Sequence, residues 1–172
     1  MTISMYDASV PVFAHGLSAL SAMLGKAAAH AQARRFDPAA LLQARLYPDM
    51  FPLSRQVQVA ADAAKFGAAR LAGIDPPSHP DTESTFDELR ARIASTTEFL
   101  HSVPRERIDG GEEREVVVPL RGGGQTLRMP GLQFLLGFAQ PNFYFHLTTS
   151  YALLRHNGVE VGKMDFLGRT SP

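Results

Sequence analysis

The chain of 172 residues contains no cysteine, and its charges have no bias toward one sign. Without cysteine there can be no disulfide, thiolate nucleophile or thiolate metal ligand, so any metal site must use His, Asp, Glu, Asn or Gln. The 17 Lys and Arg residues balance 17 Asp and Glu residues, and no block of like charges occurs. The electrostatic footprint of a phosphate-backbone binder is missing, so we expect no nucleic-acid partner.

Long apolar runs and an export signal are also missing. The longest uncharged apolar stretch, residues 131–145, is interrupted by Gln133, Gln140, Pro141 and Asn142. It falls short of the roughly 20 apolar residues that span a bilayer. The N-terminus MTISMYDASVPVF lacks a basic region followed by an apolar core. We therefore expect a soluble, cytoplasmic protein with no membrane partner.

Helical periodicity dominates the part of the sequence that follows, and the length suits one domain covering residues 1–172. Phe13, Leu17, Leu20 and Leu24 fall at spacings of three and four, which predicts a first helix that ends near residue 34. Ser4 and Ser9 are both possible N-caps. We favour the early start at Ser4, with Pro11 kinking the first turns.

Two further long helices are predicted in the middle of the chain. Asp37-Pro38 begins a short helix, and Pro52 begins a long one that ends at Gly73. The proline-rich segment 73–84, with His79, is expected to be an exposed connector. Thr85 and Glu88 then have the spacing of a capping box for a helix that runs to residue 102.

Residues 114–129 change character and predict a β-hairpin. Val116 to Val118 are β-branched, and the run Gly122 to Gly124 separates them from Thr126 and Leu127. Pro119 indicates an edge strand. The glycine run lacks the Lys-Ser/Thr of a phosphate-binding loop, so we interpret it as a plain turn.

After Pro130, an apolar helical piece covers residues 132–140, and Pro141 begins or kinks a last long helix that ends at Asn157-Gly158. Four amphipathic helices with a hairpin between the third and fourth predict an all-α bundle, with either crossover or up-and-down connections.

The last helix carries the candidate site. Asn142 and His146 are four residues apart and share a helix face, and Tyr144 stands between them. The aromatic residues here favour core or dimer interface over a substrate box. In the segment after this helix, Phe166 and Leu167 are expected to be buried; the alternative is a lid over the Asn142/His146 face.

Three blocks of the sequence carry a family resemblance: SMYDASVPVF (4–13), ARLYPDMFPLSRQVQVAADAAK (44–65) and PNFYFHLTTSYALLRHNGVEVGKMDFLG (141–168). Together they resemble an uncharacterised domain-of-unknown-function family within the DinB/YfiT-like metalloenzyme superfamily. The resemblance implies a DinB-like four-helix bundle with crossover connections, commonly associated as a homodimer.

The superfamily's metal site has one histidine on the second helix and two, four residues apart, on the last helix, followed by a Leu-Leu-Arg-like stretch. The sequence LLRHNGV at 153–159 resembles that stretch. Counting back implies that His146 occupies the second position of the pair, Asn142 the first, and Gln56 or Gln58 the position on the second helix. Carboxamide oxygens are weak ligands for zinc or nickel, and a structural zinc site is excluded by ligand type.

These residues leave two functions open. We favour a non-catalytic or vestigial member, without a cofactor, whose Gln56, Asn142 and His146 form a polar network and a pocket for a small molecule. The competing hypothesis is a metal-dependent enzyme, a transferase or hydrolase, with His146 as the main divalent-metal ligand. Asp49 or Gln56 would complete its ligand shell, although we favour Asp49 as a helix or turn cap.

Overall fold

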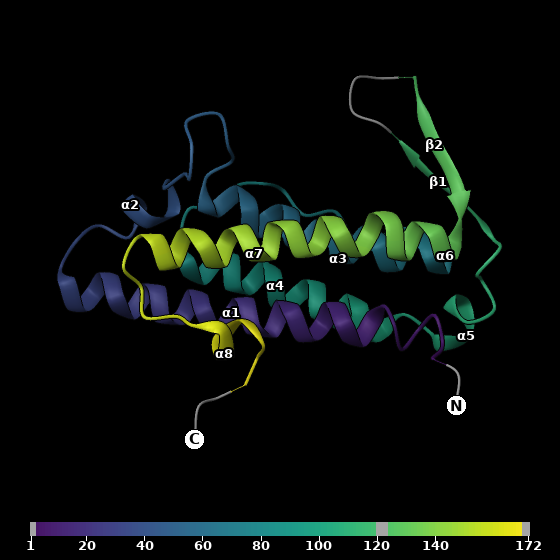
Figure 1. The fold of residues 1–172 in the computed structure, drawn as a ribbon, viewed down its shortest axis with the longest axis horizontal. Coiled ribbons are helices and arrows are strands. Elements are labelled where there is room, and N and C mark those ends of the chain that lie inside the picture. Colours follow the sequence, from purple (N-terminus) through teal and green to yellow (C-terminus); the bar gives the residue numbers. More distant parts are fainter. Residues whose placement is uncertain (1–2, 120–123, 170–172) are drawn as a thin grey trace.

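The structure is a computed structural model that describes residues 3–119 and 124–169. Four long helices form a bundle (Figure 1): α1 (Val10–Arg34), α3 (Leu53–Ala72), α4 (Phe86–Ser102) and α7 (Gln140–His156). The shorter elements are α2 (Ala39–Leu42), α5 (Arg105–Ile108), β1 (Glu115–Pro119), β2 (Thr126–Pro130), α6 (Gly131–Phe134), the π-helical turn η1 (Leu135–Ala139) and α8 (Lys163–Phe166). The predicted all-α bundle with one hairpin is confirmed.

The connection between α3 and α4 is a crossover. Lys65 lies 3.4 Å from His79, and Arg55, further toward the start of α3, forms an ion pair with Asp81. The connector therefore runs back along α3 before α4 begins, so α3 and α4 are parallel. This agrees with the crossover connections that the resemblance implies (Figure 1).

The core lies where the four long helices meet. α3 packs against α7 and α4, and α1 packs against the same two helices from the other side. By length and composition α1 is apolar enough to cross a membrane. In the bundle, however, its stripe of Phe13, Leu17, Leu20 and Leu24 is fully buried, as in the core helix of a soluble protein.

The predicted ends of the middle helices are present. Gly73 ends α3 in the left-handed conformation with φ 64°, which glycine adopts without steric cost. Thr85 and Glu88 form the capping box of α4, with the Glu88 amide donating to Thr85 Oγ1 at 3.2 Å. Asp37 accepts a hydrogen bond from the Ala39 amide at 2.9 Å before α2.

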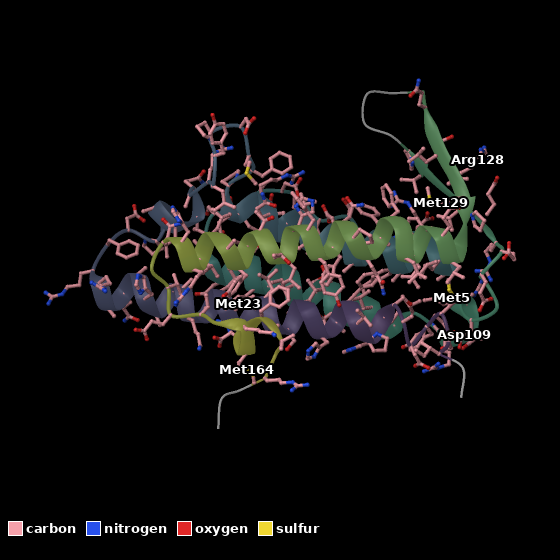
Figure 2. All side chains as sticks on the ribbon, viewed as in Figure 1. Met5, Met23, Asp109, Arg128, Met129 and Met164 are labelled. Atoms are coloured by element: carbon pink, nitrogen blue, oxygen red, sulfur yellow. The ribbon has the colours of Figure 1, made fainter. Side chains whose placement is uncertain are left out.

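The predicted early start of the first helix is wrong, because α1 begins at Val10 and Pro11 lies in its first turn. Proline fits there since the first helical amides have no acceptor within the helix. The preceding residues form turns, in which the Tyr6 amide donates to Asp109 Oδ1 at 2.8 Å. This contact spans most of the chain, so local spacing gives no sign of it. Met5 and Asp109 lie at the same end of the bundle in Figure 2.

The last long helix is continuous from α6 through η1 to α7. The backbone amide of Gln140 donates to the Leu135 carbonyl, five residues back, which is the π-helical pattern. Pro141 has no amide hydrogen to continue the α-helical ladder. The side chain of Asn142 adds a hydrogen bond one residue further on, since Nδ2 lies 2.7 Å from the Phe138 carbonyl oxygen.

The hairpin pairs β1 and β2 in antiparallel register, with Val117 opposite Arg128. Val116 and Val118 are buried, and Arg128 donates to Glu115 Oε1 at 2.7 Å. The strand that carries Arg128 and Met129 leads directly into α6 (Figure 2). Of the predicted glycine turn, Gly124 has φ 88°, whereas residues 122 and 123 lie outside the described residues.

The C-terminal segment lies against α1. Phe166 is partly buried and packs edge-on against Tyr151, but Leu167 is 37% exposed, so its predicted burial is wrong. The reason is that its backbone, not its side chain, makes the contact: the Leu167 carbonyl lies 2.9 Å from His15 Nε2. Asp165 forms an ion pair with Lys26 at 2.6 Å. Because α8 packs on α1, the segment is not a lid over the side of α7 that meets α3.

Candidate functional site

His146 and Gln56 meet across the interface of α7 and α3. His146 Nδ1 lies 2.7 Å from Gln56 Oε1, and Gln56 is 2% exposed. The other end of this amide, Nε2, donates to the Phe51 carbonyl oxygen at 3.2 Å, which fixes the orientation of the amide. The oxygen must then accept from a protonated Nδ1, so the neutral imidazole carries its lone pair on Nε2.

Gln58, the alternative partner of His146, faces the opposite side of α3. Its Oε1 accepts from Arg55 at 3.0 Å and its Nε2 donates to Glu83 at 2.9 Å. Two residues along a helix correspond to a rotation of about 200°, so only one of the two glutamines can face α7. That residue is Gln56.

Asp49 and Tyr144 lie outside this pair. Asp49 is exposed in the turn where the Met50 amide donates to the Tyr47 carbonyl. The N-cap of α3 is Pro52 and no side chain caps it, so a helix-capping role for Asp49 is wrong. The extended Pro52 backbone itself accepts the Gln56 amide at 2.9 Å. Tyr144 is 41% exposed and packs edge-on against Phe143.

An open groove of about 240 Å³ runs along α3 from Asn142, one turn before His146, toward the hairpin end of the bundle. We call it the aromatic groove. Its chemistry comes from two rows of side chains, each with four-residue spacing: Asp62, Phe66 and Arg70 on α3, and Phe134, Phe138 and Asn142 on the α6–η1–α7 helix. The π-helical turn contributes Phe138, so the irregular backbone forms part of the wall.

The two charged residues of the aromatic groove differ in their surroundings. Asp62 is held by Lys65 at 3.0 Å and by Arg92 at 2.8 Å. Arg70 lies over the ring of Phe66, with 5.1 Å between Cζ and the ring centroid. Burial lowers the pKa of Arg70, because a partly desolvated guanidinium is less favourable in its charged form.

A second polar region joins α3, the connector and α4. This charge cluster contains three cations, three carboxylates and one imidazole: Arg55, Lys65, Arg92, Asp62, Asp81, Glu83 and His79. Lys65 is 2% exposed and Arg92 is 4% exposed. Arg92 binds Asp62, Asp81 at 3.1 Å and Glu83 at 2.9 Å.

His79 is partly buried in the charge cluster, so its predicted exposure is wrong. Its Nε2 lies 3.2 Å from Ser95 Oγ, and Lys65 stands on its other side. Partial burial lowers the pKa of His79, and the positive charges of Lys65 and Arg92 lower it further. The connector is therefore attached to both helices by charged side chains and is not a free loop.

The residues around His146 do not fit a divalent transition metal. Within residues 3–119 and 124–169, no group of three or more His, Asp or Glu side chains is arranged to hold a metal ion. Gln56 and Asn142, which the resemblance places at histidine positions of the superfamily pattern, each use their amide in a hydrogen bond within the protein. A single imidazole with two carboxamides is a weak donor set for zinc or nickel.

The spacing of Asn142 and His146 in the sequence indicated the His146 face, but the aromatic groove and the charge cluster were not predicted. The groove had a detectable signal, since Asp62, Phe66 and Arg70 share one face of the second long helix. The charge cluster had none of comparable strength. Its connector residues fall in a polar, proline-rich segment whose return along α3 is a property of the tertiary fold.

Four long helices, a crossover between the second and third, and a hairpin before the last define a bundle of the DinB type. The family described as Domain of unknown function (DUF1993) matches residues 5–167, and the chain belongs to that family. The crystal structure of a DinB family member protein from Shewanella denitrificans is similar, with 42% sequence identity and a TM-score of 0.86. The match covers 97% of this chain and 93% of the other. No protein of curated function matches the chain.

Proposed function

We propose that this protein is a non-catalytic member of the DinB-like fold that binds a small molecule in the aromatic groove. The observation that supports this most is the pairing of His146 Nδ1 with Gln56 Oε1 at 2.7 Å, beside the groove. A histidine and a glutamine in this arrangement fix how α3 and α7 face each other. The interior position that holds metal ligands in the superfamily pattern then serves helix packing.

The aromatic groove supports the binding part of the proposal. Ligand sites are usually concave and apolar, with a few polar groups that orient the ligand. The three phenylalanines supply the apolar walls, and Arg70 and Asn142 supply polar groups toward its two ends. π-helical turns are frequent at functional sites, and one contributes Phe138 here.

The competing function, a metal-dependent enzyme, has one observation in its favour. Gln56 selects the tautomer in which His146 Nε2 carries the lone pair, which is the form of imidazole that binds metals. One nitrogen is a single ligand, however, and the neighbouring carboxamides are poor additions to it. These residues therefore do not support a reaction through a metal.

Metal analysis of the protein purified without a histidine tag separates the two functions. We expect metal well below stoichiometric amounts in the wild type, and a lower melting temperature for His146→Ala because Gln56 loses its partner. Stoichiometric zinc, nickel or manganese that disappears in His146→Ala would overturn the non-catalytic proposal.

A fragment screen by ligand-observed NMR tests the groove itself. Ala63 lines the groove, so Ala63→Leu should fill it and abolish binding of the fragments that the wild type binds. Ala91→Leu on the exposed side of α4 is the matched control and should leave binding unchanged. Fragments that bind both variants equally well would place binding elsewhere and contradict the proposal.

We further propose a homodimer that uses the outer side of the α6–α7 helix. Leu132, Leu136 and Phe145 are 42%, 53% and 57% exposed along this one continuous helix. Exposed large apolar side chains supply the kind of area that protein interfaces bury. Light scattering should give a dimer mass for the wild type and a monomer mass for Leu136→Glu. A monomeric wild type would contradict this proposal.

A further inference from the structure

Within residues 3–119 and 124–169, Arg70 stands apart from the buried cations Lys65 and Arg92 because no carboxylate forms an ion pair with it. Among the residues that the structure describes, its partner is the ring of Phe66. The interaction of a guanidinium with an aromatic face is attractive, but it does not neutralise the charge. A partly desolvated cation of this kind offers an attachment point for an anion.

The surrounding charges strengthen this contrast. Asp62, the carboxylate that lines the aromatic groove, is already bound by Lys65 and Arg92. The charge cluster behind it contains three cations and three carboxylates, so it is balanced within itself. Arg70 therefore adds a positive charge at one end of the groove that no carboxylate of the described residues offsets. Arginine stays protonated under all physiological conditions, even where burial lowers its pKa.

The rest of the aromatic groove suits an apolar body. The rings of Phe134 and Phe138 are stacked with centroids 5.8 Å apart, and Phe66 faces the groove from α3. The volume of about 240 Å³ lies below the roughly 300–1,000 Å³ typical of drug-sized ligands, so the ligand must be small. The groove is thus apolar along its length and positively charged where Arg70 closes one end.

We propose that the aromatic groove binds small monocarboxylates that carry an aryl or alkyl body. The carboxylate pairs with the guanidinium of Arg70, and the body packs on Phe66, Phe134 and Phe138. This inference rests on the proposed function and names the ligand class for the same groove. A planar guanidinium can bind both carboxylate oxygens at once, which a neutral amide cannot reproduce.

The test compares acids with their primary amides, which have nearly the same shape and no charge. Titration calorimetry of the untagged, full-length protein would use hexanoate against hexanamide and hydrocinnamate against hydrocinnamamide. We expect each acid to bind about tenfold or more tightly than its amide, as for hydrogen bonds to charged groups. Arg70→Gln should remove this preference.

Two variants control for a merely structural role of Arg70. Arg70→Lys keeps a cation in the last turn of α3, where the helix dipole favours it, and should retain part of the preference. Arg155→Gln changes an exposed arginine in the last turn of α7 and should leave the preference intact. Melting temperatures of all three variants show whether each remains folded.

The outcomes separate this inference from the proposed function. If acid and amide bind equally well and Ala63→Leu abolishes both, the groove binds small molecules but the anion inference is wrong. If the acid binds more tightly but Arg70→Gln keeps the preference, the inference is also wrong. If none of the four probes binds the wild type, the inference is overturned, while the fragment screen still decides the proposed function.

Discussion

The two polar regions on opposite sides of α3 compensate their buried polar groups in different ways. Toward α7, Gln56 and His146 form a neutral hydrogen bond that uses one side chain from each helix. Toward α4, Arg92 and Lys65 are buried charges that need several carboxylates, most of them from the connector. A neutral pair costs little to desolvate, whereas a buried ion requires nearly complete compensation.

This difference predicts how each region responds to change. The charged side should lose much stability when one partner is removed and should depend on pH. The side of α3 that faces α7 should tolerate replacement of Gln56 and His146 together by apolar residues. These two positions can therefore vary without loss of the fold. It is also the side on which the aromatic groove opens.

The largest expected effect comes from Arg92→Met, which removes the centre of the charge cluster. Asp62 and Glu83 would each lose a close partner, and removal of one member of a buried ion pair typically costs about 3–5 kcal/mol. Urea unfolding measures the loss in the free energy of unfolding. Arg90→Met on the same helix is the control, because its 3.7 Å pair with Asp87 is exposed and should contribute less than about 1 kcal/mol. Equal losses for both variants would contradict the contrast.

A steric contact between α1 and α7 gives an apolar change in stability with which the polar changes can be compared. A Cβ at Gly16 would lie 2.7 Å from two ring atoms of Phe143, so Gly16→Ala should destabilise by about 1–3 kcal/mol in urea unfolding. At Gly25, on the same helix, an added Cβ meets nothing within 4 Å. Gly25→Ala should therefore stabilise by about 0.5–1 kcal/mol through its helix preference. The same sign for both changes would show that Phe143 moves aside.

The neutral pair should give a smaller loss than the charge cluster. Gln56→Leu or His146→Leu alone leaves a buried polar group without its partner, which costs about 1–3 kcal/mol. The double variant should lose less than the sum, because two apolar side chains can pack together. A double-mutant cycle of urea unfolding energies measures this coupling. A cycle between Gln58, on the far side of α3, and His146 is the control, and coupling of equal size there would argue against a direct contact.

The smallest expected effect is the pH dependence carried by His79. Its pKa in the folded protein lies below the ordinary value of 6.5, so the unfolded chain takes up the proton first. The free energy of unfolding should therefore fall as the pH is lowered from 6.5 toward the pKa of folded His79. Above pH 6.5 this contribution to stability should be complete. His79→Gln should flatten this slope in urea unfolding measured at several pH values. If the free energy of unfolding of the wild type and of His79→Gln changes equally with pH, His79 does not contribute to the pH dependence.

Most of the fold could be predicted because its signals are local. The buried stripe of α1, the Gly73 cap and the Thr85/Glu88 capping box each depend on neighbours within about one or two turns. The start of α1 could not be predicted in this way, since the Tyr6 amide is held by Asp109, which follows α5. Contacts of that kind depend on how the helices are arranged.

The candidate site was predictable only in part. The spacing of Asn142 and His146 indicated the correct helix face, and Gln56 was one of two alternatives for the partner of His146. The choice between Gln56 and Gln58 depends on the rotation of α3 about its axis, which the packing of both flanking helices sets. The role of Arg70 depends on which carboxylates the fold brings near it, and in the part of the chain that the structure describes none pairs with it, which a sequence does not reveal.

The π-helical turn at Leu135–Ala139 sets the phase between the two halves of the last long helix. The bond from the Gln140 backbone amide to Leu135 closes a turn with one residue more than an α-helical bond does, so losing one residue here would make this turn α-helical and keep both halves in register. Such a deletion would leave the helical content nearly unchanged. It would nevertheless change the wall of the aromatic groove that this turn provides, so relatives one residue shorter here should differ in ligand while sharing the fold.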